Sequence, residues 1–358
     1  MISTSELSTH KLMAELLKDP DRKSILRMVF EVLYLFIRHR KFPRHYFSRY
    51  LFKKDRTNIM DYFPDKFLYN IKPLFNDKEA REVLENKLYF NFYYSQFNLR
   101  LPKIVMYNHR KLFVVDKESI EVNSLQDFKS LLKEVISKSS GDGSIFIKKT
   151  YWSFGGDKIF KIFLSQFDTD PDGIKTLYSE VIKSGFLFQE TIKQHPELDK
   201  LNASCLNTIR IDTFIDCDGK IEIMSGYLRT SIKNFHVDNI SSGGCGIPVD
   251  IQTGKLKKHG FLTMKYYGLK LPTFHPVTQT VFEDFSIPFF VQAKELVIRA
   301  AGYMPALRLV GWDVAIGETG PVLIEGNSDY DIGGNDLSEL GYRANPVFRK
   351  VLKEINYL

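Results

Sequence analysis

Two short apolar runs near the C-terminal end of the chain carry polar side chains of types that bind cations. In LVGWDVAIGETGPVLIEGNSDYD (309–331), Asp313 interrupts the first run, and Glu325 and Asn327 interrupt the second. Because side chains alternate along a strand, Glu325 and Asn327 must share one face. Carboxylate and amide oxygens are the ligands that Mg²⁺ prefers, and the ion completes its shell with water and phosphates. Three protein ligands on one face would therefore suffice for a magnesium site.

The register of the hairpin decides whether Asp313 joins that face. If Gly317 pairs with Pro321 across a three-residue loop, Asp313 lies opposite Glu325 on the same face. A slip of one residue would turn Asp313 to the other side of the sheet. The alternative to a cation site is a surface hairpin with scattered acids. That alternative must explain why carboxylates lie among apolar residues, since an unpaired buried carboxylate is costly.

A second segment has the features of a phosphate site. In IFIKKTYWSFGGDKIFKI (145–162), an expected strand ends after Lys148, and a turn through Ser153, Gly155 and Gly156 leads into another strand. Glycines allow backbone amides to approach a phosphate, and a lysine on a strand supplies a fixed positive charge. No Gly-Lys-Ser/Thr follows, so the segment is not a Walker loop. Most Gly-Gly turns only close hairpins, so this interpretation depends on the other features of the chain.

Two arginines occur inside expected strands, Arg210 in LNTIRIDTF and Arg229 in SGYLRTS. An arginine in an otherwise apolar strand needs an anionic partner, and a transferring phosphoryl group is one candidate. An internal salt bridge is the other explanation, and for either arginine alone it is the simpler one. The apolar strand LFQETI (187–192) could present backbone groups to a purine edge.

The elements that position these residues follow from the hydrophobic pattern. Residues 1–80 are expected to be helical, with Leu26, Val29, Phe30, Leu33 and Ile37 on one face of a helix. The basic and aromatic segment 38–56 has two interpretations. It could be a patch for nucleic acid or an anionic membrane, or a helical cap whose aromatic side chains enter the core while its charges stay solvated. We favour the cap, because the aromatic residues keep a helical spacing and Pro43 divides the segment.

From residue 81 the pattern alternates between helices and short strands, which indicates an α+β fold with small lobes of antiparallel sheet covered by helices. Helices are expected near 124–140, 171–184 and 287–303, with Ser124 as an N-cap. We expect four parts along the chain: a helical region at 1–80, a first lobe at 81–140, a central lobe at 141–195 and a C-terminal lobe at 196–358.

Composition narrows the class of protein. The chain has 50 Lys and Arg against 43 Asp and Glu, a net charge of +7, which favours anionic partners without naming one. The three cysteines have no metal-ligand spacing and are odd in number, so we expect a reducing, cytoplasmic setting rather than a disulfide framework. The N-terminal residues lack the apolar core of a signal peptide. The apolar stretch 25–37 is interrupted by Arg27 and Glu31 and is too short to span a bilayer.

Taken in order, these features resemble the ATP-grasp superfamily, and closely its sugar-transfer-associated ATP-grasp family. The resemblance runs from about residue 64 to 350 and rests on the following blocks: LENKLYF, FIKKTYWSFGGDKI, FLFQETIKQHPELDKLNASCLNTIRI and VGWDVAI with GPVLIEGN. It implies an ATP-grasp fold, in which two lobes hold ATP and Mg²⁺ between them, after a helical N-terminal region.

The resemblance also assigns roles to individual residues. For the nucleotide, it places Lys87 and Lys148 at the phosphates, the Ser153–Lys158 loop with Gly155 and Gly156 over the β- and γ-phosphates, Gln189, Glu190, Thr191 and Ile192 at adenine, and His195 near the ribose. For the metal and the reaction, it assigns Asp313, Glu325 and Asn327 to Mg²⁺, Arg210 and Arg229 to the γ-phosphate and the acyl-phosphate, and Asn239, Gly243 and Gly244 to the acceptor. Two positions depart from the family pattern, Lys149 in place of a proline and Asp157 in place of a glycine.

The function that the resemblance implies is an ADP-forming carboxylate–amine ligase that acts through an acyl-phosphate, with a small-molecule or glycan carboxylate and an amine as substrates in surface-polysaccharide or related biosynthesis. Two alternatives stay open: an ATP-grasp kinase that phosphorylates a sugar or another hydroxyl, and a non-catalytic nucleotide-binding protein. We expect no nucleic-acid partner, whereas a peripheral contact with a membrane or with an enzyme of polysaccharide assembly remains open.

Overall fold

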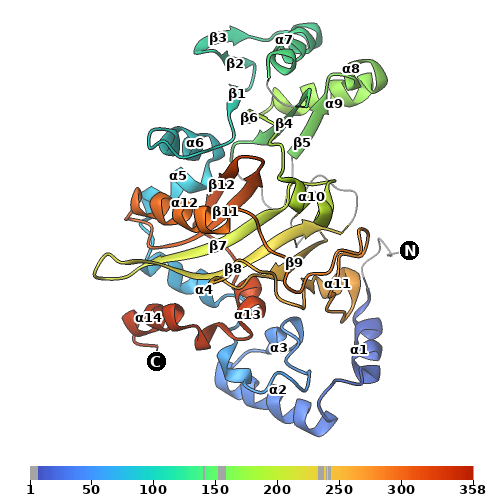
Figure 1. Ribbon diagram of the computed structural model, residues 1–358, viewed down its shortest axis with the longest axis vertical. Coiled ribbons are helices and arrows are strands. Elements are labelled where there is room, and N and C mark those ends of the chain that lie inside the picture. Colours follow the sequence, from blue (N-terminus) through green and yellow to red (C-terminus); the bar gives the residue numbers. More distant parts are fainter. Residues whose placement is uncertain are drawn as a thin grey trace.

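The computed structural model describes residues 7–139, 142–151, 159–232, 238, 240 and 243–357 (Figure 1). The molecule is elongated, with a small sheet at one end, a second sheet in the middle and the N-terminal helices at the other end (Figure 1). Both sheets are antiparallel and six-stranded, and helices cover them, so the expected α+β class is confirmed. In the described ranges, every helix is too short or too polar to cross a bilayer.

The N-terminal region is helical, as the sequence predicts. Ser8 and Ser24 cap the first two helices by accepting hydrogen bonds from backbone amides. Tyr46, Tyr50 and Phe52 of the basic and aromatic segment are buried in a core, as the cap interpretation predicts, whereas Phe42 of the same segment is exposed. The helices are α1 (Thr9–Lys18), α2 (Ile25–His39), α3 (Arg44–Ser48), α4 (Phe67–Ile71), α5 (Lys78–Glu85) and α6 (Lys87–Ser95), with short 3₁₀ turns at Ile59–Asp61 and Lys72–Leu74.

The first sheet has the strand order β3-β2-β1-β6-β4-β5. Its core faces α7, which begins after a capping box formed by Ser124 and Asp127, as expected for the N-cap. The strands are β1 (Ile104–His109), β2 (Leu112–Val115), β3 (Glu118–Glu121), β4 (Ser144–Lys149), β5 (Ile159–Phe163) and β6 (Gly185–Glu190), and the helices are α7 (Leu125–Lys138), α8 (Gln166–Thr169) and α9 (Pro171–Val181).

The second sheet has the order β10-β9-β8-β7-β11-β12, and its central strands β7 and β11 are buried along their whole length. Its strands are β7 (Thr208–Ile215), β8 (Ile221–Ser231), β9 (Gly244–Pro248), β10 (Phe261–Leu262), β11 (Leu309–Gly317) and β12 (Gly320–Asn327). The helices of this lobe are α10 (Pro196–Asn202), α11 (Met264–Tyr267), α12 (Phe290–Gly302), α13 (Gly333–Glu339) and α14 (Pro346–Glu354), with a 3₁₀ turn at Tyr342–Ala344.

The β11–β12 hairpin has a different loop from the predicted one, but it places Asp313 opposite Glu325 as predicted. Gly317 pairs with Gly320 across a two-residue loop, so the predicted pairing of Gly317 with Pro321 is wrong. A β-bulge then leaves Ile324 without a partner, and Asp313 pairs with Glu325 after all. The extra residue in β12 compensates for the residue missing from the loop. The expected face is therefore present, although the sequence argument reached it through the wrong register.

Candidate functional site

Asp313 lies at the centre of a buried ion cluster in the second sheet. Its strand β11 lies between β7 and β12, so Arg210 of β7 and Glu325 of β12 are its direct cross-strand neighbours. The Asp313 side chain is only 1% exposed. Its Oδ1 accepts a hydrogen bond from Arg210 Nε at 2.6 Å, and its Oδ2 accepts one from Arg229 Nη2 at 2.8 Å. Both arginines of the sequence analysis therefore converge on the same carboxylate.

Thr208 holds the second arginine in place. It pairs across the strands with Arg229, whose Nη2 donates to Thr208 Oγ1 at 2.7 Å. Asp238 then accepts from the backbone N–H of Thr208 at 2.9 Å and from its hydroxyl. The sequence analysis missed both residues. Thr208 could have been predicted, because side chains alternate along a strand and it therefore shares a face with Arg210. Asp238 could not, because its segment has no periodic pattern.

The cluster stays charged despite its burial. Burial opposes ionisation of Asp313, but Arg210 and Arg229 more than offset this effect and hold the pKa of the carboxyl well below its usual range. Burial likewise disfavours the charged guanidinium groups, and Asp313 outweighs it, so the pKa values of both arginines are raised. Asp238 Oδ2 also lies 3.8 Å from Arg229 Nε, so two carboxylates match the two guanidinium groups. Each guanidinium has five N–H donors, more than these contacts use, and can therefore also bind an anionic ligand.

Glu325 and Asn327 complete the side of the cluster that faces β12. The carboxyl groups of Glu325 and Asp313 interact directly. Asn327 places its amide nitrogen 3.5 Å from Asp313 Oδ2, so the three expected metal ligands lie on one face. Lys87, at the start of α6, brings its Nζ to 3.5 Å from Glu325 Oε2. The sheet therefore assembles the triad, and α6, whose Phe90 and Tyr94 belong to the core of the second sheet, adds a cation to it.

The donor set fits Mg²⁺. Two carboxylates and an amide supply hard oxygen ligands, and the Glu325 side chain is 27% exposed, so solvent and ligand can reach it. Both oxygens of Asp313 already accept bonds from arginines, but a carboxylate offers about four lone-pair positions, so it can also bind a cation. We conclude that Asp313, Glu325 and Asn327 could hold the ion.

Lys148 reaches the same site from the other sheet. It lies on β4 and is half-buried. Burial lowers the pKa of its ammonium group to about 8, with Lys87 acting in the same direction and the carboxylate of Glu325 opposing both. These interactions show that Lys148 and Lys87 lie within electrostatic range of the same carboxylate. The two predicted phosphate lysines therefore converge on the metal triad from two separate elements.

One cavity adjoins this charged cluster, and another lies at the end of β6. The first, called the site cavity below, has a volume of about 770 Å³, and residues of the cluster that line it include Lys87, Arg210, Arg229, Glu325 and Asn327. The second, of about 590 Å³, lies beside the end of β6 and is lined by residues that include Phe146, Thr191, Ile192 and Leu206. The apolar and backbone groups around the second cavity could accept a flat ring such as adenine.

The residues expected near the nucleotide base and the ribose differ in their burial and in their hydrogen-bond partners. Gln189 is buried in β6, and Glu190 pairs with Lys103 at 2.8 Å. Thr191 donates a hydrogen bond to the carbonyl of Ser144 at 3.1 Å. His195 is the N-cap of α10, where its Nδ1 accepts from a backbone amide, so the structure gives it a helix-capping role. Its predicted place near the ribose stays a prediction.

The expected acceptor and loop residues are only partly described. Gly243 has a φ of +101°, and a Cβ atom there would lie 3.0 Å from the hydroxyl of Tyr267, so glycine fits this close approach. Gly244 begins β9 and pairs with Ser231. The predictions for Ser153, Gly155, Gly156 and Asn239 lie outside the described residues, as do those for the rest of the Ser153–Lys158 loop.

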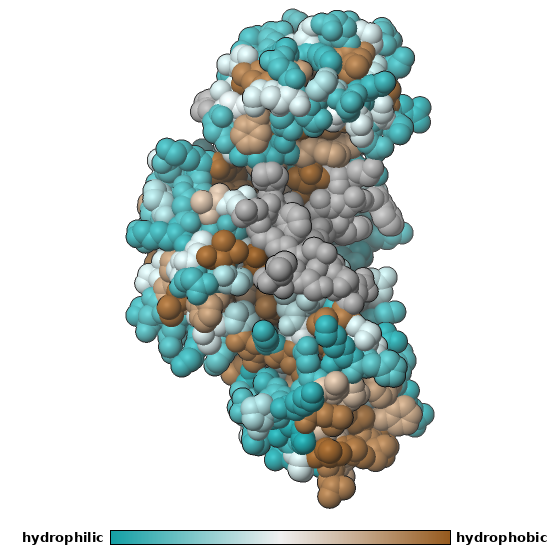
Figure 2. Space-filling model, turned by 90° about the vertical axis from the view of Figure 1, so that its right-hand side faces the viewer, coloured by the Kyte–Doolittle hydropathy of each residue, from teal (hydrophilic) through white to brown (hydrophobic). Residues whose placement is uncertain are grey.

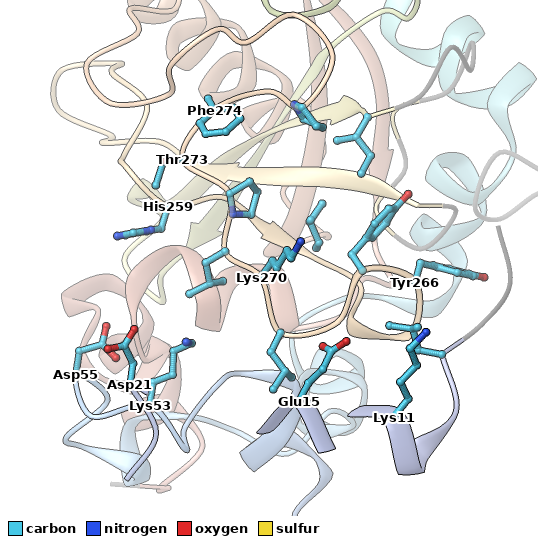
Figure 3. Close-up of a pocket in the computed structure, with 18 of the residues that line it drawn as sticks. Lys11, Glu15, Asp21, Lys53, Asp55, His259, Tyr266, Lys270, Thr273 and Phe274 are labelled. Carbon is cyan, nitrogen blue, oxygen red and sulfur yellow. The ribbon is translucent and has the colours of Figure 1, made fainter. Parts of the chain in front are cut away.

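A further cavity of about 1070 Å³ lies between the N-terminal helices and the segment after β10 (Figure 3). Lys11 and Glu15 of α1 line one side of it, and Tyr266 and Lys270 lie opposite them. Leu262 and Tyr266 line both this cavity and the site cavity. The segment after β10 therefore separates the two spaces, and the N-terminal helices complete the outer one.

Several solved structures are similar to this chain at low sequence identity. D-alanyl-alanine synthetase A from Vibrio cholerae is 13% identical, with a TM-score of 0.45 over 78% of this chain and 66% of the other. Biotin carboxylase from Campylobacter jejuni is 10% identical, with a TM-score of 0.44 over 76% and 46%. N5-carboxyaminoimidazole synthase from Aspergillus clavatus is 9% identical, with a TM-score of 0.41 over 75% and 53%. The chain thus spans less than two thirds of each of these proteins.

A comparison with curated proteins finds no match. A comparison with protein families, in contrast, finds one that covers both sheets and the whole charged cluster. The family described as sugar-transfer associated ATP-grasp matches residues 67–347, well over half of the chain. The protein therefore belongs to the sugar-transfer associated ATP-grasp family.

Proposed function

We propose that the protein is an ATP-dependent ligase that joins a carboxylate to an amine and releases ADP and phosphate. The observation that carries the proposal is the buried cluster in which Arg210 and Arg229 share the single carboxylate of Asp313. This cluster lies beside a cavity, its guanidinium groups have more N–H donors than Asp313 and Thr208 accept, and two lysines from other elements lie within range of it. A site of this kind suits a polyphosphate and the charge that develops when a phosphoryl group is transferred.

The first step in this proposal is phosphoryl transfer. An oxygen of the substrate carboxylate attacks the γ-phosphorus of ATP, the bond from that phosphorus to the β-phosphate oxygen breaks, and ADP leaves. Lys87 and Lys148 would offset charge on the phosphates, while Arg210 and Arg229 would stabilise the transferring group. Asp313, Glu325 and Asn327 would hold Mg²⁺, whose chemical contribution is to neutralise phosphate charge. The product of this step is an acyl-phosphate.

In the second step the amine attacks the acyl carbon, the bond from that carbon to the phosphate oxygen breaks, and phosphate leaves. The amine gives its proton to phosphate or to solvent, so the protein need not supply a nucleophile. The two arginines would again face the negative charge, now on the tetrahedral intermediate. The fixed positions of these groups on a sheet keep them aligned for both steps.

The name of the family, sugar-transfer associated ATP-grasp, supports a proposal for the substrate class. We propose that the carboxylate is a uronic acid or a related glycan acid and that the amine is an amino acid, as in the assembly of surface polysaccharides. The site cavity of about 770 Å³ has room for a monosaccharide beside the phosphates. We assign the pocket next to Thr191 and Ile192 to adenine.

The test is an ADP-release assay over a matrix of uronic acids and amino acids, with mass spectrometry of the products. We expect ADP formation that needs both substrates and an amide product with the mass of the two acids minus water. Arg229→Lys should lower kcat at least tenfold, because a lysine lacks the planar guanidinium fork that donates from Nε to Thr208 and from Nη2 to Asp313. A stable phosphorylated sugar without an amide would contradict ligation in favour of a kinase. Nucleotide binding without turnover across the matrix would contradict both.

A further inference from the structure

The outward side of α2 is apolar along the whole length of the helix. Leu26, Phe30 and Ile37 are 84%, 69% and 75% exposed, and Phe42 just after the helix is 59% exposed. Figure 2 shows a hydrophobic area at the lower end of the molecule, where Figure 1 places α2. The α2 apolar surface, as we call it below, comprises Ile25, Leu26, Val29, Phe30, Leu33, Tyr34, Phe36, Ile37 and Phe42.

This surface is held in a fixed orientation by the opposite side of the helix. Met28 and Leu35 are buried against the N-terminal core. Glu31 is also buried, where it accepts hydrogen bonds from Lys23 Nζ at 2.8 Å and from the Tyr46 hydroxyl at 2.8 Å. Because the polar anchor and the inner apolar residues already have partners, α2 cannot rotate its outer face into the core. The exposed residues therefore need a partner outside the described part of the chain.

Basic side chains surround the α2 apolar surface. Arg27 lies at its edge, and the exposed residues Arg38, Arg40, Lys41 and Arg44 follow at its C-terminal end. Arg27 pairs with Glu31 at 2.9 Å, whereas residues 32–54 contain no Asp or Glu, so no acid on this stretch offsets the charges of Arg38, Arg40, Lys41 and Arg44. An apolar helix face with cations at its edge is the arrangement of helices that lie in the interface of an anionic bilayer.

We propose that the α2 apolar surface binds an anionic membrane surface, with its apolar side chains at the level of the headgroups and acyl chains and its arginines and lysine against the phosphates. Each basic residue near an anionic surface contributes favourably, and each buried apolar side chain adds to that effect. Figure 1 places α2 at the extreme end of the long axis, so a flat bilayer can reach it without contacting the sheets.

A second copy of the chain and nucleic acid both fit the α2 apolar surface less well than an anionic bilayer does. A symmetric contact between two copies of the chain would bring the α2 apolar surfaces together and oppose the basic residues of one copy to those of the other, which is repulsive. Nucleic acid would need the cations on the contacting face, but here that face is apolar and the cations flank it. An anionic bilayer satisfies the apolar and the basic groups at once.

The experiment is vesicle flotation of the full chain with neutral phosphatidylcholine vesicles and with vesicles that contain phosphatidylglycerol. We expect binding only to the anionic vesicles and weaker binding at high salt. The triple variant Leu26→Ser, Phe30→Ser, Ile37→Ser should lose at least tenfold in vesicle affinity. The matched control carries Val277→Ser, Val281→Ser and Val291→Ser, at valines that are 58%, 60% and 58% exposed in the C-terminal lobe, and should bind as the wild type does.

The charges are tested with a second pair of variants. Reversal at Arg40, Lys41 and Arg44 to Glu should also lower the affinity at least tenfold, whereas reversal at the exposed Lys111, Lys117 and Lys175 of the first sheet's lobe should not. Circular dichroism and thermal unfolding verify that each variant is folded. Equal binding by the α2 variants and their controls would overturn the proposal, as would no binding to anionic vesicles. A dimer that the triple serine variant converts to a monomer, without vesicle binding, would assign the surface to a second copy instead.

Discussion

At the scale of single residues, the charge balance around Asp313 determines what the site can bind. Arg210 and Arg229 keep its carboxyl ionised, and the further N–H donors of these arginines can bind an anionic ligand. The family resemblance assigned these three residues to one site, and the structure brings their side chains together, while their roles stay predictions. The sequence could not predict that Thr208 and Asp238 orient Arg229, because that contact depends on a segment far along the chain that has no pattern of its own.

Lys148 gives the site a pH dependence. Burial lowers its pKa to about 8, so in the free protein its positive charge is present below that pH and is lost as the pH rises through it. Bound phosphates favour the protonated form, so ATP affinity should fall by up to about tenfold per pH unit above pH 8. Calorimetric titration at pH 7 and pH 9, in buffers of different ionisation enthalpy, should show proton uptake on binding at the higher pH.

The matched variant for this prediction is Lys148→Arg, because a guanidinium stays charged throughout this range. We expect the affinity of that variant to change little between pH 7 and pH 9. Lys111→Arg, at an exposed position in the same lobe, should keep the slope of the wild type. An equal slope in the wild type and in Lys148→Arg would show that another group titrates.

At the scale of the elements, the β11–β12 hairpin shows how far a strand pattern can lead. Alternation predicts that Glu325 and Asn327 share a face, and the structure agrees. The loop length and the bulge at Ile324 could not be predicted, because residue types do not show which residue leaves the ladder. The predicted loop is one residue longer than the observed one, and the bulge that was not predicted adds one residue to β12. The two differences cancel, because each changes the register by one residue. A correct face therefore followed from an incorrect loop.

Gly311 of β11 tests whether the sheet positions Arg210. A Cβ atom there would lie 2.9 Å from Asp212 Oδ1 and 3.1 Å from Arg210 Cδ, so Gly311→Ala must displace one of these side chains. We expect a loss of about 1–3 kcal/mol in the free energy of unfolding, as for other overpacked sites. If the sheet positions Arg210 in this way, its displacement weakens the bond to Asp313, and ADP formation should fall at least tenfold. Urea unfolding and the ADP assay measure the two effects.

Gly317 of the same strand is the control for this substitution. The nearest atom to a Cβ there is the carbonyl oxygen of Lys193 at 3.4 Å, which is an ordinary contact. Gly317→Ala should therefore change the stability by less than about 0.5 kcal/mol and leave the ADP formation near the wild-type rate. If both alanine variants retain activity, the position of Arg210 does not depend on the room that Gly311 provides.

At the scale of the whole molecule, two hydrophobic cores flank the site. One lies within the first sheet and its helices, and the other fills the second sheet, with no buried residue in common. The class of fold and most helices and strands were predictable, because each follows from local periodicity. The convergence of Lys87, Lys148 and the metal triad was not, since it depends on how the two sheets are placed. Nor did periodicity show that one face of α2 stays exposed.

The separate cores of the two sheets predict that these two parts of the molecule unfold in different transitions when no nucleotide is bound. Phe128→Ala, in the core of the first sheet, should cost about 3–5 kcal/mol and lower the Tm of one transition only. Leu228→Ala, in the other core, should lower the other one. ATP with Mg²⁺ contacts both lobes in our proposal, so it should raise both transitions or merge them. Scanning calorimetry of the two variants would contradict this account if each substitution shifted both transitions equally without ligand.

The central claim is that Asp313, Glu325 and Asn327 hold Mg²⁺ for the phosphates of ATP, and calorimetric titration of Glu325→Gln tests it most directly. Wild-type protein should bind ATP at least tenfold more tightly with Mg²⁺ than without it, and Glu325→Gln should lose most of this difference. The control is Glu318→Gln in the loop of the same hairpin, where Glu318 pairs with Lys193 at 2.7 Å. That variant should respond to Mg²⁺ as the wild type does. An unchanged response to Mg²⁺ in a folded Glu325→Gln protein would contradict the account.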